Sequence, residues 1–159
     1  MNSFLQTVAR WIAQGFGSGL SPVAPGTLGT LWAWVFWIFV LERLSPAALG
    51  IVLLLSLFIG WWACQRTAAL LGSEDPSSIV WDEILAFWCV LALLAPANFS
   101  TQLWAFVWFR FFDAVKPGPV AWADRVFKGT GWRGAWGILF DDFVAAFCTL
   151  LVFALWRSF

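Results

Sequence analysis

The sequence contains no histidine and no tyrosine, and charged residues make up only 11% of its 159 residues. A soluble domain of this length needs a polar surface that so few charges cannot cover, so the soluble class is excluded. The missing histidine excludes a phosphohistidine nucleophile and imidazole metal ligands. The formal net charge is zero, so the composition gives no indication of a nucleic-acid partner.

Several motifs of soluble enzymes are also missing. The three cysteines have no CxxC spacing and no arginine six residues downstream, which excludes a cysteine-phosphatase loop and predicts small buried hydrophobes. No DxD pair is present for an aspartyl-phosphate enzyme. The glycine-rich stretches lack the GK[ST] ending of a P-loop and the full dinucleotide fingerprint.

The residues that are present indicate an integral membrane protein. Hydrophobic residues make up 62% of the chain, including 14 Trp and 17 Phe, and the mean hydropathy is +0.82. We expect a single domain over residues 1–159 that is all-α, a polytopic membrane helical bundle of about five transmembrane helices plus short interfacial helices. The expected spans are Leu28–Leu41, Pro46–Cys64, Asp82–Leu94, Phe99–Val115 and Gly134–Trp156, and the expected interfacial helices are Met1–Gln14 and Val120–Lys128.

The basic residues predict the orientation of these spans. With five spans and a cytoplasmic N-terminus, only two of the nine basic residues, Arg43 and Arg157, fall on the outer side. This asymmetry follows the positive-inside rule. The other seven are Arg10, Arg66, Arg110, Lys116, Arg125, Lys128 and Arg133.

Charges within or beside the apolar runs are the strongest pointer to function. Carboxylates inside a membrane helix cost about 2.5–3.5 kcal/mol on insertion scales, so they usually face a cavity, an ion or a partner. The same topology brings these charges to one face, together with the segment Gly15–Thr30, which holds five glycines before Thr30. The charged residues are Asp82, Glu83, Arg110, Asp113, Lys116, Asp141 and Asp142.

An all-oxygen set of this kind suits Mg²⁺ or Mn²⁺ better than Zn²⁺ or Cu²⁺. We expect Asp82, Glu83, Asp141 and Asp142 to bind the metal, and these four together with Asp113 to form the catalytic group. Basic and hydroxyl groups complement a phosphate, and glycines let backbone N–H groups approach it. The expected phosphate-binding residues are Arg110, Lys116, Ser18, Thr27 and Thr30. A metal and a phosphate at the cytoplasmic membrane surface suggest a lipid headgroup.

Each motif also has a purely structural interpretation. Asp82 and Glu83 could complement the dipole at the start of a helix, and Asp113 could pair with Arg110 or Lys116 at a spacing of three. Asp141 and Asp142 are harder to explain in this way, because two adjacent acids inside a span have no inexpensive structural role. Two other classes of function remain open, a small proton- or ion-coupled transporter and a non-catalytic assembly factor.

Four motifs, in order, resemble the phosphatidylglycerophosphatase A family. They are SPVAPGTLGT at 21–30, VWDEILAFW at 80–88, FRFFDAVKPGPV at 109–120 and GAWGILFDDFVAA at 134–146, and they cover nearly the whole chain. The resemblance implies a Mg²⁺-dependent hydrolase of the bacterial inner membrane. It would remove the terminal phosphate of phosphatidylglycerophosphate to give phosphatidylglycerol. Attack by a metal-activated water is favoured over attack by a carboxylate, and the oligomeric state is not indicated.

Overall fold

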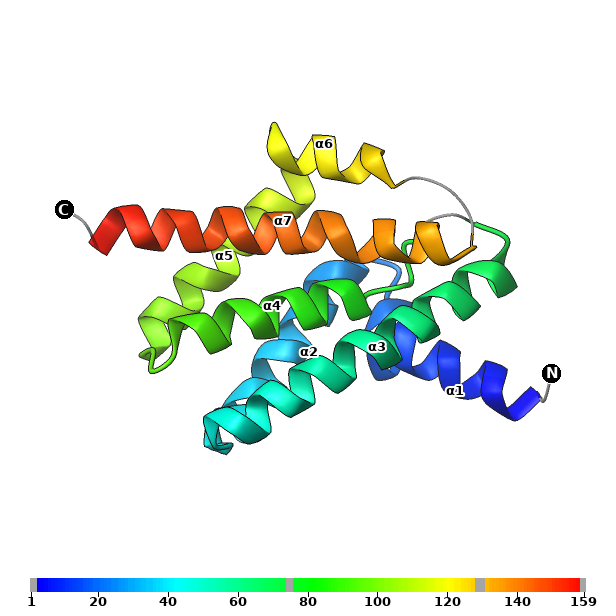
Figure 1. The fold of residues 1–159 in the computed structure, drawn as a ribbon, viewed down its shortest axis with the longest axis horizontal. Coiled ribbons are helices and arrows are strands. Elements are labelled where there is room, and N and C mark those ends of the chain that lie inside the picture. The colour runs from blue at the N-terminus through cyan, green and yellow to red at the C-terminus, as the bar shows by residue number, and fades with distance from the viewer. Residues whose placement is uncertain (1–2, 74–75, 128–130, 158–159) are drawn as a thin grey trace.

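The computed structural model describes residues 3–73, 76–127 and 131–157, and within these ranges every regular element is helical (Figure 1). The all-α prediction is therefore confirmed. The elements are α1 (Ser3–Ala13), the 3₁₀ helix η1 (Gly15–Leu20), α2 (Pro25–Phe39), the 3₁₀ helix η2 (Leu41–Arg43), α3 (Pro46–Leu71), α4 (Trp81–Leu94), α5 (Phe99–Val115), α6 (Pro119–Val126) and α7 (Gly131–Arg157).

Three helical segments among the described residues are long and apolar enough to cross a membrane. They are Pro25–Arg43, which joins α2 to η2, then Pro46–Leu71 and Arg133–Trp156. With 14 and 17 residues, α4 and α5 are shorter than the roughly 20 residues of a full span. The expected number of about five spans therefore stays a prediction.

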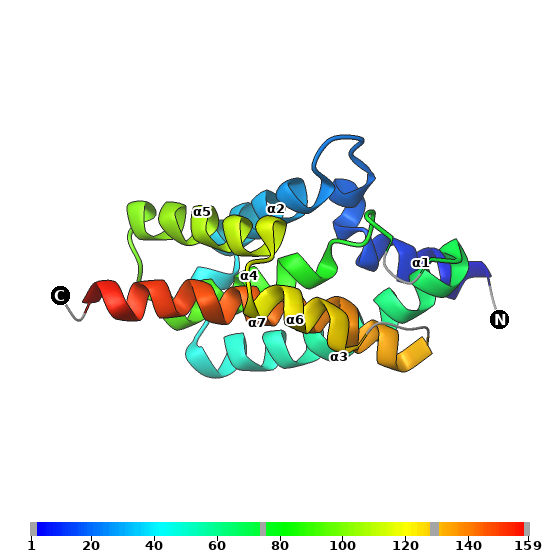
Figure 2. The same ribbon diagram turned by 90° about the horizontal axis from the view of Figure 1, so that it is seen from above.

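The short helix α4 lies at the centre of the bundle. It contacts α2, α3, α5 and α7, with α2 and α5 on one side and α3 and α7 on the other (Figure 2). Ten of its residues are buried, Ile84, Ala86, Phe87 and Val90 completely. A helix enclosed by protein need not match the bilayer thickness, because its neighbours rather than lipid surround it.

The outward faces of the surrounding helices are apolar. Large hydrophobic side chains are exposed on α2, α3, α5 and α7, including Val35, Phe58, Trp104 and Leu155. An apolar outer surface around a packed core is typical of a bundle inside a membrane. Because α5 also carries such residues, part of its length contacts lipid if α2, α3 and α7 cross the bilayer.

Helix ends are set by local sequence signals. The side chains of Ser45 and Asn98 accept hydrogen bonds from the backbone N–H groups of Ala48 (3.3 Å) and Thr101 (2.8 Å), which caps α3 and α5. Gly72 ends α3 in the left-handed conformation. Helices α4 and α5 begin and end within one residue of the predicted ranges Asp82–Leu94 and Phe99–Val115.

The two short helices that the sequence predicts at the membrane interface also form as helices. Helix α1 packs against α3, and the carbonyl of Ala13 accepts a hydrogen bond from the backbone N–H of Val80 (2.9 Å). This bond ties the N-terminal segment to the start of α4. Helix α6 occupies most of the predicted range Val120–Lys128, whose last residue lies outside the described residues.

Candidate functional site

A cavity of about 320 Å³ lies where α2 and α4 begin, α5 ends and α7 passes. Five carboxylates and two cations line it, so its formal charge is strongly negative. The carboxylates are Asp82, Glu83, Asp113, Asp141 and Asp142, and the cations are Arg110 and Lys116. The structure therefore brings together the charged residues that the sequence placed on one face.

Three of these carboxylates form a compact cluster. Asp82, Glu83 and Asp142 each offer an oxygen, and these oxygens lie within 4.8 Å of one another. Asp82 and Glu83 stand in the first turn of α4, while Asp142, only 3% exposed, reaches them from α7. Carboxylate oxygens at such spacing suit a hard divalent cation.

Two observations test whether the cluster fits a metal ion. The Oε2 atom of Glu83 is buried and has no hydrogen-bond partner among the residues that the structure describes. Buried acceptors are normally paired, so this oxygen is available as a ligand. The two cations of the cavity do not neutralise its five carboxylates, and a buried excess of negative charge is costly without a counter-ion. The residues present fit a divalent cation.

Arg110 joins the cluster to the end of α5. Its guanidinium forms an ion pair with Asp113, one turn along the helix, and its Nη1 lies 3.8 Å from Glu83 Oε1. Nη1 also donates to the hydroxyl of Thr30 (3.4 Å), which itself donates to the carbonyl of Gly26 (2.8 Å). The orientation of Arg110 is therefore fixed from both α2 and α5.

Lys116 lies between two carboxylates. Its Nζ donates to Asp124 Oδ1 of α6 at 2.5 Å and to Asp141 Oδ2 of α7 at 2.6 Å. Burial alone lowers the pKa of this ammonium, but the hydrogen bonds to Asp124 and Asp141 outweigh burial and hold its pKa above the ordinary value. Lys116 therefore stays protonated at neutral pH.

The start of α2 forms one wall of the cavity through Ala24, Pro25 and Gly26. Ala24 is the N-cap, in the left-handed conformation (φ 47°), and Pro25 opens the helix. A helix N-terminus presents free N–H groups and a positive dipole end, which favour an anion. At Gly26 a Cβ atom would overlap Oε1 of Glu83, so the glycine allows α2 to approach the carboxylate cluster.

Substitution of Gly26 by alanine is expected to displace Glu83 and to reduce activity by about 10–100-fold, the usual effect of disturbing a residue that orients a site. The new methyl group would also lie 3.1 Å from Arg110 Nη2. The activity that the resemblance implies, release of phosphate from a phosphorylated lipid, measures the effect in the purified variant. Gly50→Ala is the matched control, because that glycine of α3 has open space around it. Equal activity of the two variants would contradict the inference that the close packing of α2 against Glu83 at Gly26 supports the site.

The predicted hydroxyl ligands occupy different places. The hydroxyl of Ser18 donates to the carbonyl of Gly15 (2.8 Å) inside η1, and Thr30 is fully buried behind Arg110. Thr27 is half-buried in the first turn of α2. None of the three is among the residues that line the cavity, as far as the described chain shows.

Sequence reasoning missed two residues near the site. Asp124 contacts Lys116 but stands on α6, where a lone acid looks like an ordinary interfacial charge. The signal that could have identified it is the turn Lys116–Pro119, because it leads directly into the short helix α6, whose Asp124 is only eight residues from Lys116. The exposed Ser77 lines the cavity from the loop before α4 and carries no motif of its own.

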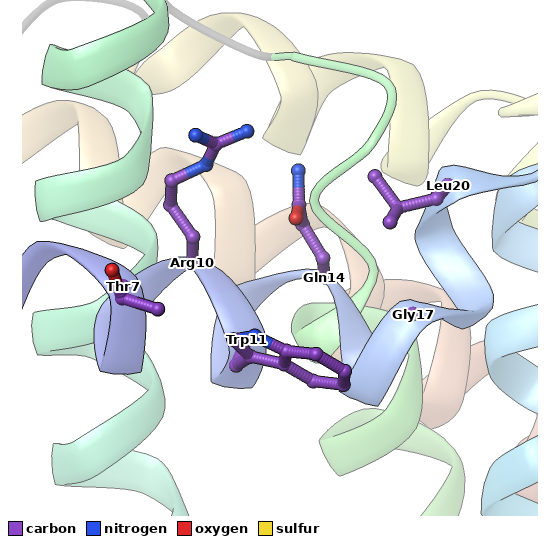
Figure 3. A pocket seen from close by; sticks show the side chains of 6 residues that line it. All are labelled: Thr7, Arg10, Trp11, Gln14, Gly17 and Leu20. Carbon is purple, nitrogen blue, oxygen red and sulfur yellow. The ribbon is translucent and has the colours of Figure 1, made fainter.

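A second cavity of about 230 Å³ lies between α1 and η1 (Figure 3). Its lining residues are Thr7, Arg10, Trp11, Gln14, Gly17 and Leu20. In Figure 3 the side chains of Arg10 and Gln14 extend to the same side of α1. Since its described lining contains no carboxylate, it offers no set of metal ligands.

Comparison with known proteins agrees with the motifs. The family model described as phosphatidylglycerophosphatase A matches residues 11–157. The phosphatidylglycerophosphatase A of Escherichia coli is 40% identical over 84% of this chain and 74% of its own length. That of Haemophilus influenzae is 37% identical over 91% of this chain and 86% of its own length.

A further relative carries a different name. A Bacteroides thetaiotaomicron protein, provisionally named phosphatidylinositol-3-phosphatase, is 36% identical over 92% of this chain and 91% of its own length. No solved structure matches the chain. The family model covers nearly all of the sequence, including every residue of the carboxylate cavity. The chain belongs to the phosphatidylglycerophosphatase A family, whose curated members are phosphatases.

Proposed function

We propose that this protein hydrolyses phosphatidylglycerophosphate to phosphatidylglycerol and phosphate, with Mg²⁺ as cofactor, at the cytoplasmic face of a bacterial inner membrane. The observation that carries the proposal is the cavity in which Asp82, Glu83 and Asp142 cluster beside Arg110 and Lys116. The family membership and the names of two relatives support this substrate.

In this proposal Asp82, Glu83 and Asp142 hold the metal ion. When bound, Mg²⁺ supplies positive charge that neutralises phosphate oxygens and activates water. Asp141 belonged to the ligand set expected from sequence, but its Oδ2 accepts a hydrogen bond from Lys116. We therefore assign Asp141 to the positioning of Lys116.

The cations and the start of α2 bind the phosphate. Lys116 and Arg110 both line the carboxylate-rich cavity, and both can contact the terminal phosphate there. Asp113 orients Arg110 through their ion pair. The N-terminal end of α2 adds a favourable dipole for the charge that develops on phosphorus oxygens.

Hydrolysis then proceeds with a simple balance of atoms. The oxygen of a water molecule bonds to phosphorus, and the bond between phosphorus and the glycerol oxygen breaks. One of the cavity carboxylates accepts a proton from the attacking water, and the same carboxyl group then gives that proton to the departing glycerol oxygen. The products are phosphate and a lipid alcohol.

The position of the cavity suits a lipid substrate. Its lining comes from the starts of α2 and α4, the end of α5 and the first half of α7, away from the C-terminal end of α7. The lining helices α2, α5 and α7 also carry exposed apolar side chains. A phospholipid can therefore keep its acyl chains in the bilayer while its headgroup enters the cavity. The positive-inside asymmetry supports the cytoplasmic orientation.

Phosphate release by the purified protein in detergent micelles tests the proposal. We expect release from phosphatidylglycerophosphate with Mg²⁺, loss of release with a chelator, and no restoration by Ca²⁺, which prefers longer bonds and looser geometry. Phosphatidylinositol 3-phosphate is the matched comparison, because one relative carries that name. Release from this lipid alone would overturn the proposed substrate, and no release from either lipid would favour the transporter alternative.

A further inference from the structure

We propose that the cavity between α1 and η1 binds the phosphodiester headgroup of an anionic phospholipid, at a site separate from the carboxylate cavity. The inference uses the membrane location contained in the proposed function and goes beyond the proposed activity. Among the described residues the two cavities share no lining residue. The described lining of this second cavity offers a guanidinium and an amide but no carboxylate.

The amide of Gln14 is the group that points to a ligand. Gln14 lines the cavity and is only 6% exposed, yet its side chain makes no hydrogen bond to any residue that the structure describes. Buried amides are normally paired, so this one is available to a ligand in the cavity. The backbone N–H groups of Gly17 and Gly19 both donate to the carbonyl of Gln14 at 3.0 Å. The backbone that carries the amide is therefore fixed without a ligand.

Arg10 supplies the positive charge of the site. It stands one turn before Gln14 on α1, and its carbonyl accepts a hydrogen bond from the backbone N–H of Gln14 (2.9 Å). The side chains of Arg10 and Gln14 extend to the same side of the helix (Figure 3). Within the described part of the chain, no carboxylate pairs with Arg10. A guanidinium and an amide together offer several N–H donors, which suit the oxygens of a phosphate group.

The size of the cavity favours one group of a larger ligand. Its volume of about 230 Å³ is below the range of about 300–1,000 Å³ that is typical of sites enclosing a whole small molecule. Nearby on α1 and η1, the apolar side chains of Trp11, Phe16 and Leu20 are exposed. Apolar side chains on such short surface helices insert between the headgroups and the acyl chains of a bilayer. A phospholipid can therefore place its phosphate in the cavity and keep its acyl chains beside these residues.

The charge of the lining selects among phospholipids. A zwitterionic lipid carries a cationic headgroup next to its phosphate, and this second charge would be repelled by the guanidinium of Arg10. The described lining offers no carboxylate that could receive it. An anionic lipid such as phosphatidylglycerol has the same phosphodiester without the cation, so it keeps the attraction and avoids the repulsion. The chemistry of the site therefore favours the anionic lipid.

Native mass spectrometry of the purified protein in a neutral detergent tests the proposal. The probes are dioleoyl phosphatidylglycerol, dioleoyl phosphatidylcholine and inorganic phosphate, each titrated without Mg²⁺. We expect the wild type to bind phosphatidylglycerol more tightly than phosphatidylcholine. Its affinity for phosphatidylglycerol should fall by about tenfold or more in Arg10→Gln, the scale of a hydrogen bond to a charged group. Equal binding of the two lipids, or displacement of phosphatidylglycerol by equimolar inorganic phosphate, would overturn the inference.

Matched variants separate lipid binding from a structural role. Arg125→Gln removes an exposed charge from the short helix α6 and should leave the affinity unchanged. Gln14→Glu places a carboxylate one turn from Arg10, where it should pair with the guanidinium and exclude the phosphate. Phosphatidylglycerol should raise the melting temperature of the wild type and of Arg125→Gln by binding the native state, but not that of Arg10→Gln.

The exposed Arg10 decides the test, because its replacement removes no packing from the core. If Gln14→Glu does not fold, Arg10→Gln and Arg125→Gln still give the comparison. An unchanged affinity for phosphatidylglycerol in Arg10→Gln would overturn the inference. Lack of phosphatase activity in the wild type would instead contradict the proposed function and leave the binding result intact, since none of these measurements needs turnover.

Discussion

Replacement of Asp142 by asparagine is expected to abolish Mg²⁺-dependent phosphate release, with a loss on the order of 10³-fold or more, while the protein stays folded and membrane-inserted. Loss of a single group that stabilises charge in a transition state already costs about 10²–10³-fold, and Asp142 would also hold the metal. The residue is 3% exposed and supplies the only α7 oxygen of the three-carboxylate cluster. Phosphate release from phosphatidylglycerophosphate measures the effect.

A stability measurement makes this prediction independent of activity. Without metal, the melting temperature of Asp142→Asn should equal or exceed that of the wild type, because a buried carboxylate is removed from a crowded negative cluster. Mg²⁺ should raise the melting temperature of the wild type by binding the native state, and this increase should be lost in the variant. Glu42→Gln is the charge-matched control. A variant that keeps both turnover and the Mg²⁺-dependent increase would remove Asp142 from the metal site.

The helix boundaries show where the sequence was sufficient. The break Ala95–Thr101 separates the two spans predicted at Asp82–Leu94 and Phe99–Val115, and α4 and α5 occupy these ranges to within one residue, with Asn98 capping the second helix. The end of α3 was predicted at Cys64–Arg66, but the helix continues to Leu71. Arg66 is exposed and Thr67 fully buried, and α1 packs against this helix. A contact between segments so distant in sequence cannot be derived from local hydropathy.

The sequence likewise predicted part of the site but not all of it. Clustering of acids at span ends was enough to predict one shared cavity, since charges in apolar helices must converge on something polar. The sequence could not predict that Asp141 and Asp142 have different partners. Adjacent residues on a helix point about 100° apart, so each contacts a different neighbour. Only the packing of α6 and α4 against α7 decides that Asp142 meets Glu83 while Asp141 meets Lys116.

The Gly-rich segment illustrates the same limit. Its glycines were expected to bring backbone N–H groups to a phosphate, and Gly26 does line the cavity. At Gly19, however, a Cβ atom would overlap the carbonyl of Ser78, so this glycine allows η1 to pack against the loop that precedes α4. A glycine-rich composition indicates that the backbone packs closely against something, but it does not show whether this is a ligand or another part of the protein.

Replacement of Lys116 by methionine is expected to reduce kcat/KM by about 10²-fold, the usual effect of losing a group that stabilises charge on a transferring phosphate. Methionine keeps much of the apolar side-chain stem and removes only the ammonium. If Lys116 served merely as a partly exposed ion pair, the change would matter by only about 0–1 kcal/mol to stability and little to rate. Steady-state kinetics on phosphatidylglycerophosphate and the melting temperature separate these outcomes.

A double variant resolves the remaining ambiguity in this result. Lys116→Met leaves Asp124 and Asp141 facing each other without their shared cation, and their repulsion of the substrate could lower kcat/KM indirectly. Adding Asp124→Asn removes one of these charges and should recover part of any lost melting temperature. It should not recover kcat/KM, because the phosphate still lacks its ammonium partner. Recovery of near wild-type kcat/KM in the double variant would show that Lys116 acts only by neutralising its neighbours, and would withdraw it from phosphate binding.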